Sequence, residues 1–175
     1  MTGERIEGYA TALVEVARAE GRLEQVEEEL FRFTSALDAS DELRAAITGQ
    51  TLPPARRQAI VEELLGGRAS QTTTALVSFV AAAGRGKDLP EIVRRVIERA
   101  SAERGAEVAE VRTTVPLDDD RRQRLAAALS RATGKTVEVR VVVDPSVIGG
   151  VVAQIGDTVI DGSVRTRLER LKEHL

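Results

Sequence analysis

The spacing of the apolar residues changes near Gly105, and this change constrains the fold more than any other feature of the sequence. Before Gly105, apolar residues recur every three or four positions, as they do on one face of an α-helix. After it, valines alternate with polar residues, as they do in a half-buried β-strand. The sequence therefore predicts a mainly α protein, with an N-terminal six-helix bundle over residues 1–105 and a small α+β C-terminal domain over residues 106–175.

Residues 1–105 contain six amphipathic segments separated by glycine, proline or a helix-capping serine. Ser40 and Ser70 each precede an apolar run, where a serine hydroxyl can accept a hydrogen bond from the first turn of a helix. Pro53 and Pro54 lie where a helix can begin, because the first N–H groups of a helix need no partner within it. The predicted helices cover residues 6–17, 23–37, 40–47, 54–65, 70–83 and 88–105. Their short connections favour a bundle.

The first and fifth of these helices are apolar on more than one side. Residues 75–83 contain one polar residue, Ser78, and the segment from Tyr9 to Val14 is also largely apolar. A helix that is apolar nearly all round is either central in its bundle or binds another surface. The residues alone leave both interpretations open.

Residues 106–175 predict two helices and four strands. The predicted strands cover residues 111–115, 137–143, 151–155 and 158–160. Gly156-Asp157 separates the last two strands and predicts a hairpin. Asp118 and the two aspartates after it place negative charge at the start of a helix that ends at Gly134, where the helix dipole favours it. Ser163 caps a last helix, whose apolar residues are Val164, Leu168, Leu171 and Leu175.

The composition excludes several kinds of chemistry. The chain has no cysteine and a single histidine, His174, so disulfides, thiolate metal sites and cysteine nucleophiles are excluded and a Ser-His-Asp triad is not expected. A net charge of −3 and only four aromatic residues do not favour nucleic-acid binding. We therefore expect no catalytic residue, no cofactor and no metal ion.

Two glycine-containing segments do not match nucleotide-binding motifs. Gly84-Arg-Gly-Lys87 is followed by Asp88, where a P-loop has serine or threonine. Gly149-Gly150 precedes a predicted strand, whereas a dinucleotide motif opens a helix. Both are interpreted as turns. The acidic residues at 118–120, 144, 157 and 161 lack the spacing of a calcium loop and are interpreted as helix caps and turns.

No segment predicts a membrane span or a targeting signal. A spanning helix needs about 20 apolar residues, and no such run is present. The first residues run directly into a charged helical pattern, without an apolar signal core. The chain is therefore expected to remain in the compartment where it is made.

Residues 143–168 resemble the C-terminal signature of the delta subunit of bacterial ATP synthase, a family that includes the mitochondrial oligomycin-sensitivity-conferring protein. The Gly149-Gly150 pair, the Gly156-Asp157 hairpin and Ile160-Asp-Gly-Ser-Val-Arg165 occur in the family's order and spacing. Tyr9-Ala-Thr-Ala-Leu is similar to the family's first helix. Gly8 departs from the family, which often has a basic residue at this position.

This resemblance implies a non-catalytic stator subunit of the rotary, proton-translocating ATP synthase, which links the alpha/beta catalytic head to the b subunits of the peripheral stalk. It implies a groove between the first and fifth helices for the N-terminal helix of an alpha subunit. The groove residues are Tyr9, Ala12, Leu13, Val16, Leu76, Phe79, Val80 and Ala83. The implied stalk contact is in the C-terminal domain, at Gly149, Gly150, Asp161, Ser163, Arg165, Leu168 and Leu171. The implied location is the cytoplasmic face of the bacterial cell membrane, reached only through the complex.

Three other functions remain as alternatives. The first is a free-standing helical adaptor that binds amphipathic helices. The second is an RNA- or anion-binding module, which would use Arg121, Arg122, Arg124 and Arg131 together with Arg165, Arg167, Arg170 and Lys172. The third is an enzyme acting alone, for which the sequence offers no residue to assign. The C-terminal domain is expected to be the less stable half, because its core is small.

Overall fold

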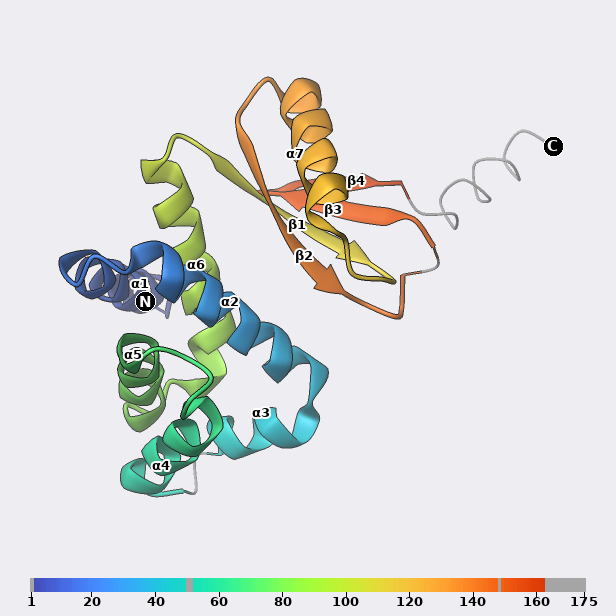
Figure 1. Ribbon diagram of the computed structural model, residues 1–175. Helices are drawn as coiled ribbons and strands as arrows, with labels where there is room; N and C mark the ends of the chain where they lie inside the picture. Colours follow the sequence, from blue (N-terminus) through green and yellow to red (C-terminus); the bar gives the residue numbers. More distant parts are fainter. Residues whose placement is uncertain (1, 50–51, 148, 163–175) are drawn as a thin grey trace. The chain divides into compact units, whose positions relative to one another are not determined.

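The computed structural model of the protein describes residues 2–49, 52–147 and 149–162 (Figure 1). The chain divides into two compact units, Met1–Ala100 and Ser101–Leu175. The division falls inside a continuous helix, before the change of periodicity at Gly105.

Within the described part of the first unit, six α-helices and one 3-10 turn follow one another, which confirms the predicted helices. They are α1 (Thr2–Ala19), α2 (Leu23–Ala39), α3 (Asp41–Thr48), α4 (Pro54–Leu65), α5 (Gln71–Ala82), η1 (Gly86–Asp88) and α6 (Leu89–Glu103). The predicted caps are confirmed too, because Ser40 accepts a hydrogen bond from the backbone N–H of Leu43 and Ser70 accepts one from that of Thr73, each at 3.2 Å.

The core of the first unit is built from the apolar stripes that the sequence predicts. Helix α6 contributes one full face to it, and α1 and α5 pack their buried residues into the same unit. The apolar residues of these helices that are fully or nearly fully buried are Ala10, Leu13, Val14, Ala17, Val77, Val80, Ala81, Leu89, Ile92, Val93, Val96 and Ala100. Each large apolar side chain buried in this way contributes roughly 1.5–3 kcal/mol relative to exposure.

Helix α6 ends in a glycine-containing cap that precedes the first strand. The backbone N–H of Gly105 donates to the carbonyl of Ala102 and that of Ala106 donates to Ser101, both at 3.0 Å. This is the Schellman arrangement, and it needs the left-handed φ of +69° that Gly105 adopts. The first strand begins two residues later.

The second unit is a four-stranded sheet with helix α7 (Asp119–Thr133) on one face. The strands are β1 (Glu107–Thr113), β2 (Val137–Val143), β3 (Val151–Ile155) and β4 (Thr158–Asp161), in the order β2-β1-β3-β4. Strands β1 and β2 are parallel, and the other pairs are antiparallel. The predicted hairpin between β3 and β4 is confirmed.

The first strand differs from its prediction at both ends. It begins at Glu107 rather than residue 111 and ends at Thr113 rather than residue 115. At its end the backbone N–H of Val115 donates to the Thr113 hydroxyl at 3.1 Å, which closes a local turn and takes Val115 out of the ladder. At its start, Glu107 pairs with Val137 across the parallel ladder, a long-range partner that local spacing does not reveal.

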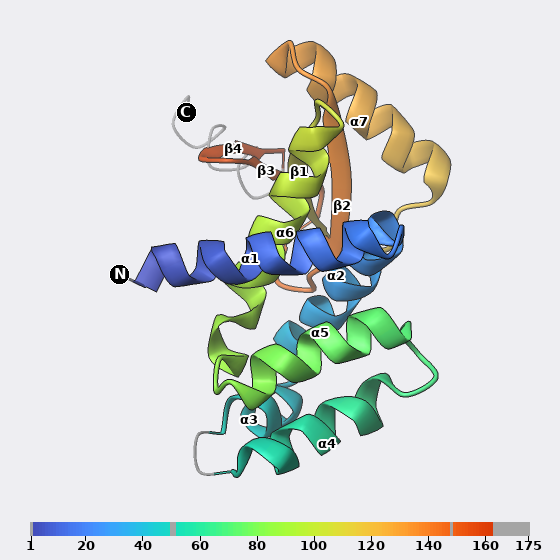
Figure 2. The same ribbon diagram turned by 90° about the vertical axis from the view of Figure 1, so that its left-hand side faces the viewer.

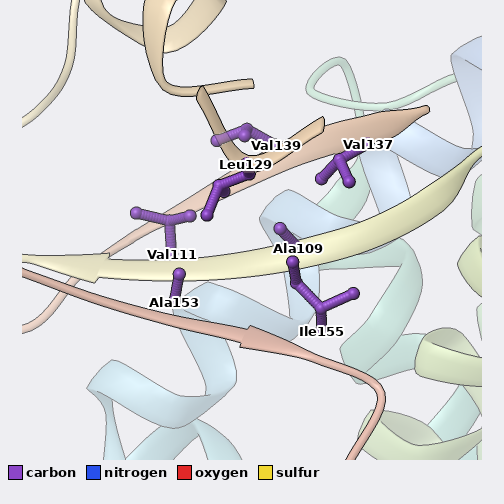
Figure 3. Packing of buried hydrophobic residues seen from close by; sticks show 7 residues of the cluster. All are labelled: Ala109, Val111, Leu129, Val137, Val139, Ala153 and Ile155. Carbon is purple, nitrogen blue, oxygen red and sulfur yellow. The ribbon is translucent and has the colours of Figure 1, made fainter. Parts of the chain in front are cut away.

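A small apolar cluster between the sheet and α7 forms the core of the second unit (Figure 3). Leu129 of α7 lies over residues from three strands, and the cluster consists of Ala109, Val111, Leu129, Val137, Val139, Ala153 and Ile155. The side chain of Asp118 caps α7 by accepting a hydrogen bond from the backbone N–H of Arg121 at 2.8 Å, as predicted. The predicted last helix, from Ser163, lies outside the described residues. No helix within the described ranges has the length and apolar character to cross a membrane.

Candidate functional site

Helices α1 and α5 lie side by side and antiparallel in the first unit (Figure 2). The ring centroids of Tyr9 and Phe79 are 5.8 Å apart, with the ring planes tilted by 49°. Near the opposite end of the pair, the Thr72 hydroxyl donates a hydrogen bond to the carboxylate of Glu20. The two helices singled out by their apolar character in the sequence are therefore neighbours.

The structure divides the eight predicted groove residues into a surface set and a core set. Phe79 is 57% exposed and Val16 is 43% exposed, although both side chains are large and apolar. Ala12 and Ala83 are also exposed, and Tyr9 is half-buried. The remaining three, Leu13, Leu76 and Val80, are buried in the bundle. They therefore support the surface from beneath and do not form it.

One further residue extends this surface. Ala75 is exposed and lies one turn before Phe79 on α5, so the two side chains share a helix face. The four-residue spacing between Ala75 and Phe79 is the sequence signal that could have identified Ala75 as part of this surface. We refer to Tyr9, Ala12, Val16, Ala75, Phe79 and Ala83 as the α1/α5 face.

The α1/α5 face is apolar, and α5 carries no ionisable side chain. The charged groups that meet α5 come from other helices and bind its two ends. At the start of α5, Glu29 of α2 accepts hydrogen bonds from the backbone N–H of Ser70 at 2.9 Å, from the Ser70 hydroxyl at 2.8 Å and from the Thr73 hydroxyl at 2.5 Å. Burial by itself raises the pKa of Glu29, but the hydrogen bonds from Thr73, Ser70 and Gln25 outweigh it, so the pKa is lowered.

At the other end of α5, Arg57 of α4 is the charged partner. Its Nη2 donates to the carbonyl oxygen of Ala82 at 3.1 Å, and the residue is 8% exposed. A guanidinium at the C-terminus of a helix and a carboxylate at its N-terminus both interact favourably with the helix dipole. Sequence reasoning missed Glu29 and Arg57, because their partners are 41 and 25 positions away and no local spacing connects them.

In the second unit, the predicted stalk residues lie partly within the described ranges. Gly149 and Gly150 both have positive φ, 66° and 81°, and lead into β3. Asp161 is exposed at the end of β4, and its register partner is Val152. Gly150 and Asp161 therefore lie at the same end of the sheet. The other four residues, Ser163, Arg165, Leu168 and Leu171, lie outside the described residues.

Three of the four arginines of α7 are paired with the aspartates at its start. Arg121, Arg122 and Arg124 form ion pairs with Asp118, Asp119 and Asp120 at 3.5, 2.7 and 2.9 Å. Such exposed pairs contribute little to stability, but they neutralise the local positive charge. The helix face considered for anion binding therefore carries less net positive charge than its number of arginines indicates.

Over the parts of the chain that the structure describes, no group of three His, Cys, Asp or Glu side chains could hold a metal ion. The distinctive surface is instead the α1/α5 face, and exposed apolar surface of this kind is typical of proteins that bind other proteins. The fold and this surface define a class: a helical bundle joined to a small α+β unit, with an apolar face on two adjacent helices.

Comparisons with known proteins place the chain in a family. The model of the ATP synthase delta (OSCP) subunit family matches residues 6–175. An ATP synthase subunit delta of Streptomyces lividans is 41% identical over 153 residues, which cover 87% of this chain and 56% of that protein. One of Symbiobacterium thermophilum is 36% identical over 167 residues, covering 95% of this chain and 90% of that protein.

The chain belongs to the ATP synthase delta (OSCP) subunit family. It spans 56% to 61% of the lengths of its Streptomyces, Beutenbergia, Kineococcus and Frankia relatives. Its fold is similar to that of a chain in the cryo-EM structure of the Toxoplasma gondii mitochondrial ATP synthase hexamer. That similarity has a TM-score of 0.61 at 21% identity and covers 97% of this chain and 96% of the other.

Proposed function

We propose that this protein is a non-catalytic stator subunit of a bacterial F-type ATP synthase, which links the alpha/beta head to the peripheral stalk so that the head resists rotor torque. Family membership supports the assembly. The α1/α5 face carries the proposal, because Phe79 and Val16 are the large apolar side chains that are exposed to water in the described part of the bundle.

The partner of the α1/α5 face is the N-terminal helix of an alpha subunit. An amphipathic helix laid along two antiparallel helices buries its own apolar stripe and theirs together. Covering Phe79 and Val16 would remove two large side chains from water, at roughly 1.5–3 kcal/mol for each side chain fully buried. Leu13, Leu76 and Val80 hold the two helices in place under this contact.

The second contact joins the C-terminal unit to the b subunits of the stalk. Gly149, Gly150 and Asp161 lie at one end of its sheet. Two contacts carried by one chain raise the effective concentration of each for its partner, so the link is stronger than either contact alone. The protein then lies at the cytoplasmic face of the cell membrane, held there by the complex.

Calorimetric titration with a peptide of the alpha-subunit N-terminus tests the first contact. We expect one-to-one binding by the wild-type protein, lost in Phe79→Asp and Val16→Asp, because a carboxylate on this face would be buried without a partner. Val159→Asp is the matched control, since Val159 is 59% exposed but lies on β4. Binding that survives in Phe79→Asp, or no binding by the folded wild-type protein, would contradict the proposed site.

A free-standing helical adaptor remains the second candidate, because the α1/α5 face alone does not specify whose helix it binds. The two functions differ in partner. Recovery of alpha and b subunits with the tagged protein from membranes supports the stator function, and recovery of the protein without them supports the adaptor.

A further inference from the structure

Helix α5 is uncharged, yet a charged side chain from a neighbouring helix contacts each of its ends. This arrangement bears on the α1/α5 face, because α5 supplies Ala75, Phe79 and Ala83. The inference rests on the proposed function and concerns what keeps that face ready for its partner.

Glu29 contacts the start of α5 in a way that an ordinary surface carboxylate does not. It is 8% exposed, and one of its oxygens accepts the Ser70 N–H, the Ser70 hydroxyl and the Thr73 hydroxyl. Its other oxygen accepts a hydrogen bond from Gln25 of its own helix at 3.0 Å. Glu29 thus joins the first turn of α5 to α2 by charge-assisted hydrogen bonds, which are stronger than neutral ones.

Arg57 makes the corresponding contact at the end of α5. Its guanidinium is buried beside the last turn and donates to the Ala82 carbonyl, one of the C-terminal carbonyls that lack a partner within the helix. Both ends of α5 are therefore held by side chains of the sign that its dipole favours.

Beyond its first turn, the buried side of α5 packs mainly through apolar side chains. Leu76, Val77, Val80 and Ala81 bury one side of the helix, and Phe79 is presented on the other side against Tyr9. Apolar packing resists separation more than sliding or rotation, because it has no preferred direction. The hydrogen bonds at the two ends depend on angle, so they fix the rotation of α5 and its position along its own axis.

We propose that Glu29 and Arg57 are positioning residues that hold α5 in the one orientation in which the α1/α5 face can bind a partner helix. A protein that spends only part of its time in the competent state binds with an affinity reduced by that fraction. We refer to the contacts of Glu29 and Arg57 with the two ends of α5 as the clamps. Loss of either clamp lowers the competent fraction of the free protein. The complex itself, once formed, keeps its contacts.

Binding kinetics of Glu29→Gln with the alpha-subunit N-terminal peptide test this proposal. We expect the association rate to fall on the order of tenfold, as expected for loss of hydrogen bonds to a charged group, with the dissociation rate unchanged. Hydrogen exchange of the free protein is measured in parallel. The amides of α5 are expected to lose protection in Glu29→Gln while those of α6 keep theirs.

The control is Ile92→Val, a core truncation in α6 chosen because Ile92 is fully buried and lies on a different helix from α5, Glu29 and Arg57. It should lower the melting temperature while leaving the hydrogen bonds of Glu29 and Arg57 to α5 in place, so peptide association should be unchanged while the protein is folded. Arg57→Lys provides a second variant, which keeps the charge but loses the fixed fork of the guanidinium. It should show the same kinetic pattern as Glu29→Gln in weaker form.

Two outcomes overturn the inference. Equal association rates for Glu29→Gln and wild type would show that α5 needs no clamp, and an increased dissociation rate would show that Glu29 acts on the complex instead. Failure of the wild-type protein to bind the peptide is a separate result. It would remove the proposed function and this inference about binding with it, whereas the exchange of α5 would still show whether Glu29 holds the helix.

Discussion

Arg104 donates two hydrogen bonds to the carboxylate of Glu138, from Nε at 2.8 Å and from Nη2 at 2.7 Å. The buried hydroxyl of Ser101 donates a third, at 2.9 Å. Glu138 is in β2, and its partners belong to the end of α6 and the residue after it. These hydrogen bonds, with that of Arg104 foremost, lower the pKa of Glu138.

Replacing Glu138 by glutamine should destabilise the C-terminal unit by about 1 kcal/mol, because the contact is charge-assisted but about a third exposed. Chemical denaturation at neutral pH measures the change. Glu110→Gln is the control, since Glu110 pairs with Arg112 on its own strand and Arg112 is 52% exposed. A loss in Glu110→Gln equal to that in Glu138→Gln would rule out a special contribution of this contact.

Acid should weaken the clamp on α5. The folded-state pKa of Glu29 lies below its ordinary value of 4.5, so the unfolded chain takes up the proton first as the pH falls. The stabilisation is therefore complete above the ordinary pKa and is lost as the pH falls through the lowered one. Wild type should lose stability over this acid range more steeply than Glu29→Gln, as measured by thermal melts at a series of pH values. Parallel pH profiles for the two proteins would contradict the assignment.

Ser40 and Ser70 both cap the start of a helix but should differ in their contribution to stability. Ser70→Ala removes an N-cap and a hydrogen bond to Glu29, whereas Ser40→Ala removes an N-cap alone. A cap contributes about 1 kcal/mol, so Ser70→Ala should cost more than Ser40→Ala, by about another hydrogen bond to a charged group. Urea denaturation of both variants tests the order, and equal losses would show that the hydrogen bond to Glu29 adds nothing.

Binding to the α1/α5 face should depend weakly on salt. The face is apolar and α5 has no charge, so screening has little to act on. We expect the Kd of the alpha-subunit peptide to change less than about threefold across a tenfold range of salt, whereas a basic surface that binds RNA would lose affinity steeply. A steep salt dependence would return the arginine-based alternative to consideration.

The C-terminal unit should open more readily than the helical one. Its core cluster has seven buried residues between one helix and the sheet, and two of them are alanines. A small core buries little apolar surface to offset the conformational entropy lost on folding, so the free energy of unfolding is small. Backbone amides of β1 should therefore exchange faster than those of α6, and equal protection of the two would contradict this expectation.

The helices and strands could be predicted from the sequence because their signals are local. Ser40, Ser70 and Asp118 each cap a helix through a backbone N–H three residues away, and the Gly156-Asp157 turn separates two strands that pair directly. The start of β1 was missed, because Glu107 is placed by its pairing with Val137 and has no local signal.

The candidate site was predicted only in part. The apolar character of α1 and α5 singled out two helices that the structure places side by side, since amphipathicity is read from consecutive residues. It did not distinguish Leu13 and Val80, which are buried, from Val16 and Phe79, which are exposed. That distinction depends on how the helices rotate against their neighbours, and this depends on contacts between distant residues, such as Glu29 with Ser70.

The position of β2 at the margin of the sheet has a consequence for handling the protein. The backbone N–H of Glu107 in β1 donates to the carbonyl of Thr136, and the N–H of Asp144 donates to the carbonyl of Thr113 in β1. The even-numbered residues of β2 therefore direct their backbone groups toward β1, whereas Val139 and Val141 direct theirs away from the sheet. A valine-rich strand at the edge of the sheet that the structure describes is a template for strand addition by another molecule. Concentrated solutions of the C-terminal half should therefore be prone to ordered aggregation, with a charge introduced on this strand as the remedy.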